Sequence, residues 1–239
     1  MNGTNARPGQ RWWRRWLAAG FDLLFPARCA GCGRRGQEWC PGCQAGLVRP
    51  EPPFCPRCGA SLPSGRGCRD CRARDFPLVA RSFARYEGPL RRAILQLKYR
   101  PNRRLAAVMG GWLADLYRGQ AWQATLILPV PLAGRRQRLR GYNQASLIAS
   151  ALAERVALPM EEGGLRRVRE TPSQVGLDPA GRLQNVEGAF EANPAVVHNQ
   201  TLLVIDDLFT TGATLAACAQ AGLRAGARRV YALTVARAR

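Results

Sequence analysis

Neither a secretory signal nor a membrane-spanning segment is apparent in this chain of 239 residues, since a bilayer span needs about 20 consecutive apolar residues. Residues 11–25 come nearest, but Asp22 interrupts their short apolar part and no small-residue cleavage site follows. We therefore expect a cytoplasmic location. Residues 1–26 are expected to form an amphipathic helix packed on the rest of the protein, with an interfacial membrane helix as the less favoured alternative. Its apolar side comprises Trp12, Trp13, Trp16, Leu17, Phe21 and Leu24.

Lysine and acidic residues are both scarce. Arginine accounts for all but one of the 36 basic residues, and 16 acidic residues leave a formal net charge of +20. Residues 1–145 carry a net charge of +19, whereas residues 146–239 carry +1. A basic half of this size attracts polyanions such as nucleic acids by counterion release. The alternative is a basic surface with no dedicated partner.

Residues 27–75 lack the apolar runs that a core requires and are rich in Cys, Gly, Pro and Arg. Such a segment needs a cross-link in order to fold. Eight of the nine cysteines form four Cys-x-x-Cys pairs, and two such pairs complete a tetrahedral zinc site. Without a secretory signal, this spacing predicts zinc rather than disulfides. We expect two structural zinc ions, one bound by Cys29, Cys32, Cys40 and Cys43 and the other by Cys55, Cys58, Cys68 and Cys71.

Alternatives to this zinc assignment stay open. The first and third Cys-x-x-Cys pairs could share a metal in a crossed arrangement, and redox-active or disulfide-bonded cysteines are a less favoured possibility. The ninth cysteine, Cys218, is expected at a buried apolar position. The single histidine, His198, lies in a polar turn and is assigned no role.

From residue 76 onward, apolar strands alternate with helices, which predicts an α/β fold with a parallel sheet flanked by helices. We expect three units: the helix at residues 1–26, a double zinc ribbon at residues 27–75 and the α/β domain at residues 76–239. Long polar loops are expected at residues 131–141 and 169–188. Strands are expected at residues 79–86, 125–130, 165–168, 202–205 and 230–235, and helices at residues 89–99, 103–117, 143–156 and 213–224.

The strand expected at residues 202–205 leads into two aspartates and a Thr- and Gly-rich turn before a helix. Ligands of open α/β sheets bind at the carboxyl ends of strands. Backbone amides and threonine hydroxyls at a helix N-terminus hold phosphate, and Gly212 allows a close approach. Adjacent carboxylates beside a phosphate cradle suit a ligand with a diol or a divalent metal next to its phosphate, such as ribose 5-phosphate. A plain strand–turn–helix with capping threonines explains only part of this string.

Two groups of basic residues are candidate anion sites. The loop after the strand at residues 125–130 contains Arg135, Arg136, Arg138 and Arg140, which suit a pyrophosphate. Nucleic-acid phosphate and a solvated loop are the alternatives for this group. The second group is the candidate surface for single-stranded DNA and comprises Arg91, Arg92, Lys98, Arg100, Arg103 and Arg104.

The string VIDDLFTTGAT at residues 204–214 resembles the signature of type I phosphoribosyltransferases. The resemblance implies a type I phosphoribosyltransferase-like sheet and a site for phosphoribosyl pyrophosphate. It implies that Asp206 and Asp207 contact the ribose hydroxyls as catalytic residues, and that Mg²⁺ bridges the pyrophosphate and the ribose. The 5′-phosphate would be held by Thr210, Thr211, Gly212, Ala213 and Thr214, and we expect Arg136, Arg140 and Gly141 to bind the same ligand.

The chain also resembles the ComF family over about residues 20–237. The likeness lies in PVPL and RGYNQ at residues 129–144, YEGPL and LKY at residues 86–99, the run from residue 167 to residue 190, and the paired cysteines. Within that run Gly181 stands where the family usually has an acidic residue. The role linked to this family is DNA uptake in natural transformation, with competence machinery such as a helicase as an implied partner.

Three functions are consistent with these motifs. We expect a ComF-type protein that binds phosphoribosyl pyrophosphate and single-stranded DNA and acts in DNA uptake. The second possibility is an active phosphoribosyltransferase of nucleotide metabolism, although no residue stands out as the reader of an acceptor base. The third is a ligand-sensing regulator without turnover, because a retained phosphate loop indicates binding but not catalysis.

Overall fold

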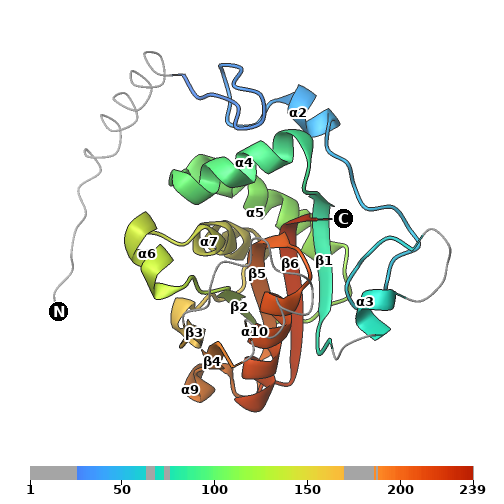
Figure 1. Cartoon of the computed structure of the whole chain (residues 1–239), viewed down its shortest axis with the longest axis vertical. Coiled ribbons are helices and arrows are strands. Elements are labelled where there is room, and N and C mark those ends of the chain that lie inside the picture. Colours follow the sequence, from blue (N-terminus) through green and yellow to red (C-terminus); the bar gives the residue numbers. More distant parts are fainter. Residues whose placement is uncertain (1–25, 63–67, 73–75, 170–185, 187, 239) are drawn as a thin grey trace, which may run out of the picture.

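The computed structural model describes residues 26–62, 68–72, 76–169, 186 and 188–238 (Figure 1). The amphipathic helix expected at residues 1–26 lies outside these residues except for Pro26, as does most of the loop expected at residues 169–188. Among the described residues, no helix has the length and apolar character needed to cross a bilayer.

A four-stranded parallel sheet in the order β1-β6-β5-β2 forms the centre of the protein. Its two middle strands are apolar and almost completely buried, as expected for parallel strands covered on both faces. The predicted parallel sheet is therefore confirmed. The strands are β1 (Val79–Arg85), β2 (Leu126–Pro129), β5 (Thr201–Phe209) and β6 (Arg229–Arg237).

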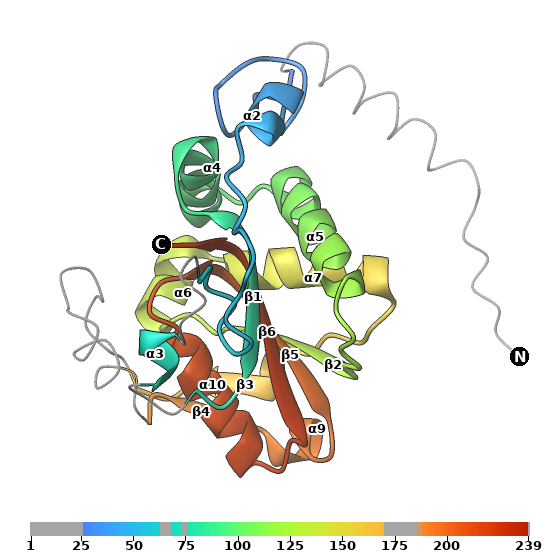
Figure 2. The same cartoon turned by 90° about the vertical axis from the view of Figure 1, so that its right-hand side faces the viewer.

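Helices cover both faces of the sheet (Figures 1 and 2). Side chains of β5 alternate between two cores, with Leu203 and Ile205 in one and Leu202 and Val204 in the other. The first core contains α4 (Gly88–Tyr99), α5 (Arg103–Arg118) and α7 (Gln144–Val156). The second core contains α10 (Ala213–Arg224), β3 (Leu165–Arg167), β4 (Phe190–Ala192) and α9 (Pro194–Val197).

The cysteine-rich segment extends along the outer strand β1. The backbone amides of Ala80 and Arg85 donate to the carbonyls of Arg57 and Val48, so this segment covers the free edge of the sheet. Its first cysteine cluster belongs to the core with α4 and α5, and its second to the core with α10. The short helices here are α2 (Pro41–Ala45) and α3 (Arg69–Arg72).

Several expected elements differ from the structure. Residues 134–140, expected as a loop, form helix α6 (Gly134–Arg140), because Gly141 at φ 72° supplies a left-handed C-cap and arginine favours helix. The strand expected at residues 165–168 follows the 3₁₀ turn Glu162–Gly164 and pairs antiparallel with β4 in a separate two-stranded sheet. Strand β5 extends to Phe209, because β6 continues to pair with it beyond Ile205.

Candidate functional site

Strand β5 extends beyond its neighbour β2 at the carboxyl edge of the sheet, and the region beside this end of β5, where the chain turns into α10, is here called the crevice. Pairing with β2 ends at Ile205, whereas pairing with β6 continues past Asp206 to Phe209. From β2 the chain passes through α6 to α7, which lies in the first core. From β5 it passes to α10, which lies in the second core, on the opposite face of the sheet. Such a divergence at the carboxyl edge of a parallel sheet is the usual ligand position in open α/β folds. Asp206 is the first residue of β5 beyond the β2 pairing.

Asp207, the second of the two aspartates of β5, forms an ion pair with a lysine from α4. Nζ of Lys98 lies 2.9 Å from Oδ2 of Asp207, and the two side chains are 21% and 6% exposed. The geometry is that of an ion pair and not of a well-aligned hydrogen bond, and this oxygen has no hydrogen-bond partner among the described residues. Asp206 Oδ1 accepts a hydrogen bond from the Asp207 amide at 2.8 Å.

The ionisation of Asp206 is strongly perturbed by its surroundings. Burial and the adjacent charge of Asp207 raise the pKa of Asp206 well above its ordinary value. Burial alone would lower the pKa of Lys98, but the charges of Asp207 and Asp206 outweigh it and raise that pKa. The buried, poorly satisfied Asp207 oxygen fits a ligand that brings hydroxyl donors or a divalent cation, so the donor set is compatible with a ribose and Mg²⁺.

The turn after β5 presents the start of α10 to the same crevice. Gly212 has φ 80° and is the N-cap of α10 without a side-chain cap, and Thr211 Oγ1 accepts from the Ala213 amide at 3.4 Å. A Cβ on Gly212 would lie 2.6 Å from the Phe209 ring and 2.8 Å from the Phe76 ring. The sequence therefore needs glycine here both for its conformation and for space. The resulting helix N-terminus suits a phosphate.

The basic helix α6 follows β2 on the other side of the crevice. The residues after its C-terminal end are held by hydrogen bonds to α4 and to the end of β2. Tyr142 donates to the Leu97 carbonyl at 2.7 Å, and Asn143 donates to the Val130 carbonyl at 2.9 Å. Arg140 donates to Gln144 Oε1 at 3.1 Å. No ion pair joins Arg136 or Arg140 to the two aspartates among the residues that the structure describes, so their expected ligand contacts remain a prediction.

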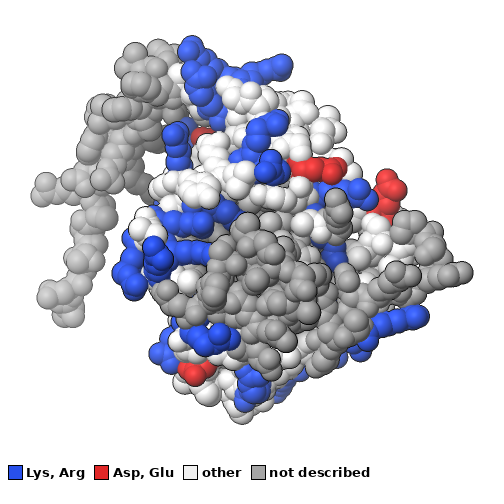
Figure 3. Space-filling model, viewed as in Figure 1, with Lys and Arg blue, Asp and Glu red and all other residues white. Residues whose placement is uncertain are grey.

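Five of the six residues expected to contact DNA are exposed on the protein surface. Arg91, Arg92 and Arg100 belong to α4 and its C-cap, and Arg103 and Arg104 begin α5. In Figure 3 basic side chains gather over the part that contains the first cysteine cluster and α4, and beside α6. Lys98 is the exception, since it pairs with Asp207 in the crevice. Its expected place on the DNA surface is therefore corrected.

The eight paired cysteines form two groups in the sequential arrangement, Cys29, Cys32, Cys40 and Cys43 in one and Cys55, Cys58, Cys68 and Cys71 in the other. Sγ–Sγ distances are 3.6 and 3.7 Å in the first group and 3.8 and 3.7 Å in the second. A tetrahedron with Zn–S bonds of about 2.3 Å has edges of about 3.8 Å, whereas a disulfide is about 2.05 Å long. Both groups therefore fit Zn²⁺ and not disulfides.

Arg237, which the sequence did not single out, connects the second zinc ribbon to the turn between β5 and α10. It is 5% exposed, donates to the Cys58 carbonyl at 2.7 Å, and lies 4.2 Å from the centroid of the Phe209 ring. Phe209 in turn limits the space at Gly212. No local pattern marks Arg237, because its contacts come from distant parts of the chain.

Residues 20–72 match the double zinc ribbon domain family. Competence protein F of Haemophilus influenzae is 30% identical over 234 residues, which cover 90% of this chain and 99% of the relative. This protein belongs to the ComF family. The DNA utilization protein YhgH of Salmonella typhi is 33% identical over 197 residues, covering 78% of this chain and 85% of the relative. Competence protein ComFC of Bacillus subtilis is 28% identical and covers 80% of each chain.

Solved phosphoribosyltransferase structures are more distant from this ComF protein. The glutamine phosphoribosylpyrophosphate amidotransferase of B. subtilis is 19% identical with a TM-score of 0.42, over 59% of this chain and 30% of the other. Adenine phosphoribosyltransferase from Thermoanaerobacter pseudethanolicus is 16% identical with a TM-score of 0.36, over 56% of this chain and 80% of the other. These similarities concern the fold alone.

Proposed function

We propose that this ComF protein binds phosphoribosyl pyrophosphate with Mg²⁺ in the β5–α10 crevice and handles single-stranded DNA during DNA uptake in the cytoplasm. One observation carries the first part. The aspartates of β5, Lys98 of α4 and the N-terminus of α10 meet at one edge of the sheet. The carboxylates suit a diol or a metal ion, the lysine suits negative charge, and the helix N-terminus suits a phosphate. Phosphoribosyl pyrophosphate with Mg²⁺ offers all three.

Each part of this ligand has a proposed partner. Asp206 and Asp207 receive the ribose hydroxyls, and residues 210–214 receive the 5′-phosphate through backbone amides and hydroxyls. The α6 residues Arg136 and Arg140, with Gly141 at the helix end, receive the pyrophosphate. Mg²⁺ supplies positive charge between pyrophosphate and ribose when the ligand is bound.

The part of the proposal that concerns DNA rests on two other observations. The similar proteins are named for competence and for DNA utilization. The excess charge of +19 lies in residues 1–145, which include the first zinc ribbon, α4, α5 and α6. Contacts of arginine with phosphate carry no sequence information, so we expect binding with little sequence preference. Components of the competence machinery, such as a helicase, are the proposed protein partners.

Turnover is a second candidate function. Strand β5 carries the carboxylates, and helix α6, which follows the neighbouring strand β2, carries four arginines. This arrangement favours departure of pyrophosphate from the anomeric carbon as a nucleophile attacks, because the arginines stabilise the leaving charge. A regulator that binds the ligand without turnover would use the same groups.

The test is a screen of the purified, zinc-loaded protein for loss of phosphoribosyl pyrophosphate and release of pyrophosphate, with and without single-stranded DNA. Release that depends on Mg²⁺ supports an active transferase. Ligand binding without release supports a sensor. A flat response of DNA affinity to salt, in place of a log–log slope of roughly −0.7 per neutralised phosphate, would remove the DNA part of the proposal.

A further inference from the structure

A pocket of about 680 Å³ lies between the first zinc ribbon and α4, outside the crevice described above. Residues 28–33 of the ribbon form one wall, and Arg92, Gln96, Tyr99 and Arg100 belong to the opposite wall. Three arginines line the pocket and no acidic residue does. Its volume is in the range of sites that hold one small organic ligand, and its charge favours an anionic one.

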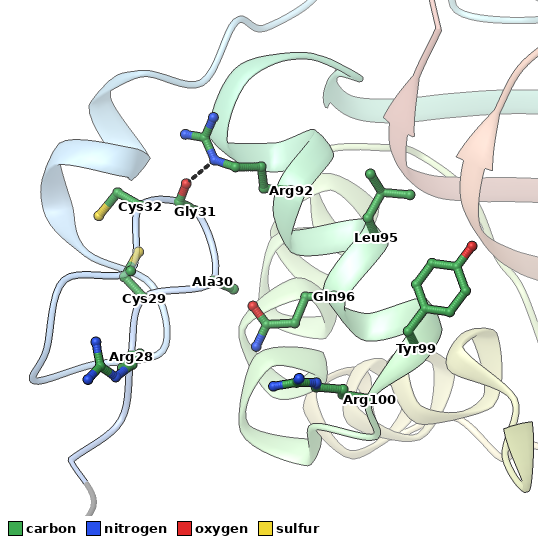
Figure 4. Close-up of a pocket in the computed structure, with 11 residues that line it drawn as sticks. Arg28, Cys29, Ala30, Gly31, Cys32, Arg92, Leu95, Gln96, Tyr99 and Arg100 are labelled. Carbon is green, nitrogen blue, oxygen red and sulfur yellow. Dashed lines mark hydrogen bonds between the residues drawn. The ribbon is translucent and has the colours of Figure 1, made fainter.

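Figure 4 shows how the walls are arranged. Gln96 and Arg100 extend from α4 toward the ribbon, whereas the Tyr99 ring projects from the same end of α4 in the opposite direction, away from the ribbon. The Nε of Arg92 donates to the Gly31 carbonyl and so joins the helix to the ribbon. Because Gly31 lies between the zinc ligands Cys29 and Cys32, the pocket depends on the folded ribbon.

Tyr99 is the unusual residue of this pocket. Its side chain is 73% exposed, so its ring contributes little to the core. The guanidinium of Arg140 from α6 lies 5.6 Å from the ring centroid. Tyr99 therefore lies between the pocket and the basic helix α6. An exposed aromatic ring among arginines is the arrangement by which proteins stack single-stranded bases while binding the adjacent phosphates.

We propose that this pocket binds one nucleotide of single-stranded DNA, with the base stacked on Tyr99 and the flanking phosphates bound by Arg28 and Arg100. The proposal rests on the DNA part of the proposed function and gives it a site. Gln96 offers a donor and an acceptor to the edge of the base. Only an unpaired base has a face free to stack, so the pocket distinguishes single strands from duplex.

Four thiolates around Zn²⁺ carry a net charge of about −2, which the three lining arginines outweigh. The strand then continues along α4 toward Arg140 and the other arginines of α6. Helix α4 contributes to both sites. Tyr99 lines the pocket, and the adjacent Lys98 pairs with Asp207 in the crevice. The path of the DNA therefore leads from the first ribbon toward the phosphoribosyl site.

The experiment is fluorescence anisotropy of labelled oligo(dT) with zinc-loaded protein. We expect Tyr99→Ala to lower affinity about tenfold, the usual effect of removing one stacked base contact, and Tyr99→Phe to retain it. Phe54→Ala is the matched control, because Phe54 is an aromatic residue of the other ribbon that is also exposed, at 42%. Arg100→Glu should lower DNA affinity without changing phosphoribosyl pyrophosphate binding, and Arg224→Glu on α10 should change neither.

An oligonucleotide with abasic positions separates base stacking from phosphate contacts. On this probe Tyr99→Ala and the wild type should bind equally, and a tenfold loss there would overturn the stacking role. If the wild type binds oligo(dT) and Tyr99→Ala binds it with the same affinity, the proposed role of the pocket is overturned, whereas the DNA part of the proposed function stands. If the wild type binds no oligo(dT), the DNA part of the proposed function fails together with the pocket. Equal affinity for duplex would also contradict the proposal.

Discussion

Nζ of Lys98 lies 2.9 Å from Oδ2 of Asp207, so α4 supplies the cation that stands beside the two carboxylates of β5. Asp206 and Asp207 are neighbouring carboxylates in β5, and the Lys98 ammonium offsets part of the repulsion between them. A bound ligand's hydroxyls or metal would compete with the ammonium for the same Asp207 oxygen. The lysine thus stabilises the pair of carboxylates at the proposed ligand position.

Replacing Lys98 by methionine should destabilise the fold by about 2–3 kcal/mol at neutral pH, because it leaves two carboxylates buried without their cation. The charge of Lys98 lowers the pKa of Asp206, so its loss raises that pKa further and the native state takes up a proton more readily. The deficit should therefore shrink as the pH falls. Thermal denaturation at pH 5 and pH 8 measures this.

Lys98→Arg serves as the control for this prediction, because it keeps the positive charge. Combining Lys98→Met with Asp207→Asn should recover part of the lost stability, since the buried charge is then removed as well. A Lys98→Met variant as stable as the wild type at pH 8 would show that the ion pair contributes nothing.

Asp206→Asn should raise the melting temperature by a few degrees at neutral pH. The pKa of Asp206 is raised, so the native state binds this proton more tightly than the unfolded state does. The contribution of Asp206 to the free energy of unfolding is therefore present at low pH and is lost as the pH rises through its native pKa. Asparagine has no proton to lose in this range, so the variant does not show this loss of stability. Calorimetric scans over pH provide the measurement. A lower melting temperature at every pH would contradict the assigned direction.

Gly212→Ala should cost more stability than the same change at Gly88. Both glycines have positive φ, 80° and 52°, but only Gly212 has aromatic carbons within 3 Å of the added Cβ. Gly88→Ala should cost about 1–2 kcal/mol from backbone conformation alone. Gly212→Ala adds the displacement of Phe209 and Phe76, and chemical denaturation should show this excess. Equal losses would mean that the rings move away without cost.

The two zinc ribbons should have different effects on the two sites. Cys71→Ser removes the second ribbon, to which Arg237 holds Phe209 beside Gly212, and should weaken binding of phosphoribosyl pyrophosphate at least about tenfold. Cys32→Ser removes the first ribbon and the Arg92–Gly31 contact, and should weaken binding of oligo(dT) instead.

Elemental analysis provides the control, with two zinc ions per wild-type chain and one per variant chain. If Cys71→Ser and Cys32→Ser weaken the binding of phosphoribosyl pyrophosphate and of oligo(dT) to the same extent, the ribbons act only through global stability. Both zinc ribbons also pack on the α/β domain at residues 76–239. Because each ribbon belongs to one of the two cores, chelation should also lower the melting temperature of that domain.

Much of the fold follows from local patterns in the sequence. Helix α10 spans residues 213–224 as expected, because Gly212 precedes it and an apolar periodicity runs through it. The zinc groups follow from Cys-x-x-Cys spacing, since neighbouring pairs reach one metal most simply. The phosphate loop is recognisable because its residues are contiguous.

Contacts between distant segments were not predictable in this way. Lys98 was expected on a DNA surface because it lies among arginines, and only the packing of α4 brings it to Asp207. Arg237 likewise acquires its role from β6 lying beside the second ribbon. The antiparallel β3–β4 pair was missed because short strands of three residues have little periodicity of their own.

The central claim is that the β5–α10 crevice binds phosphoribosyl pyrophosphate, and isothermal titration calorimetry with Mg²⁺ tests it most directly. Zinc-loaded wild-type protein should bind one ligand per chain, with a proton release that grows as the pH falls toward the raised pKa of Asp206. The Asp206→Ala, Asp207→Ala double variant should remain folded and give no binding heat. Absence of any saturable heat from the wild type at millimolar ligand would contradict the account.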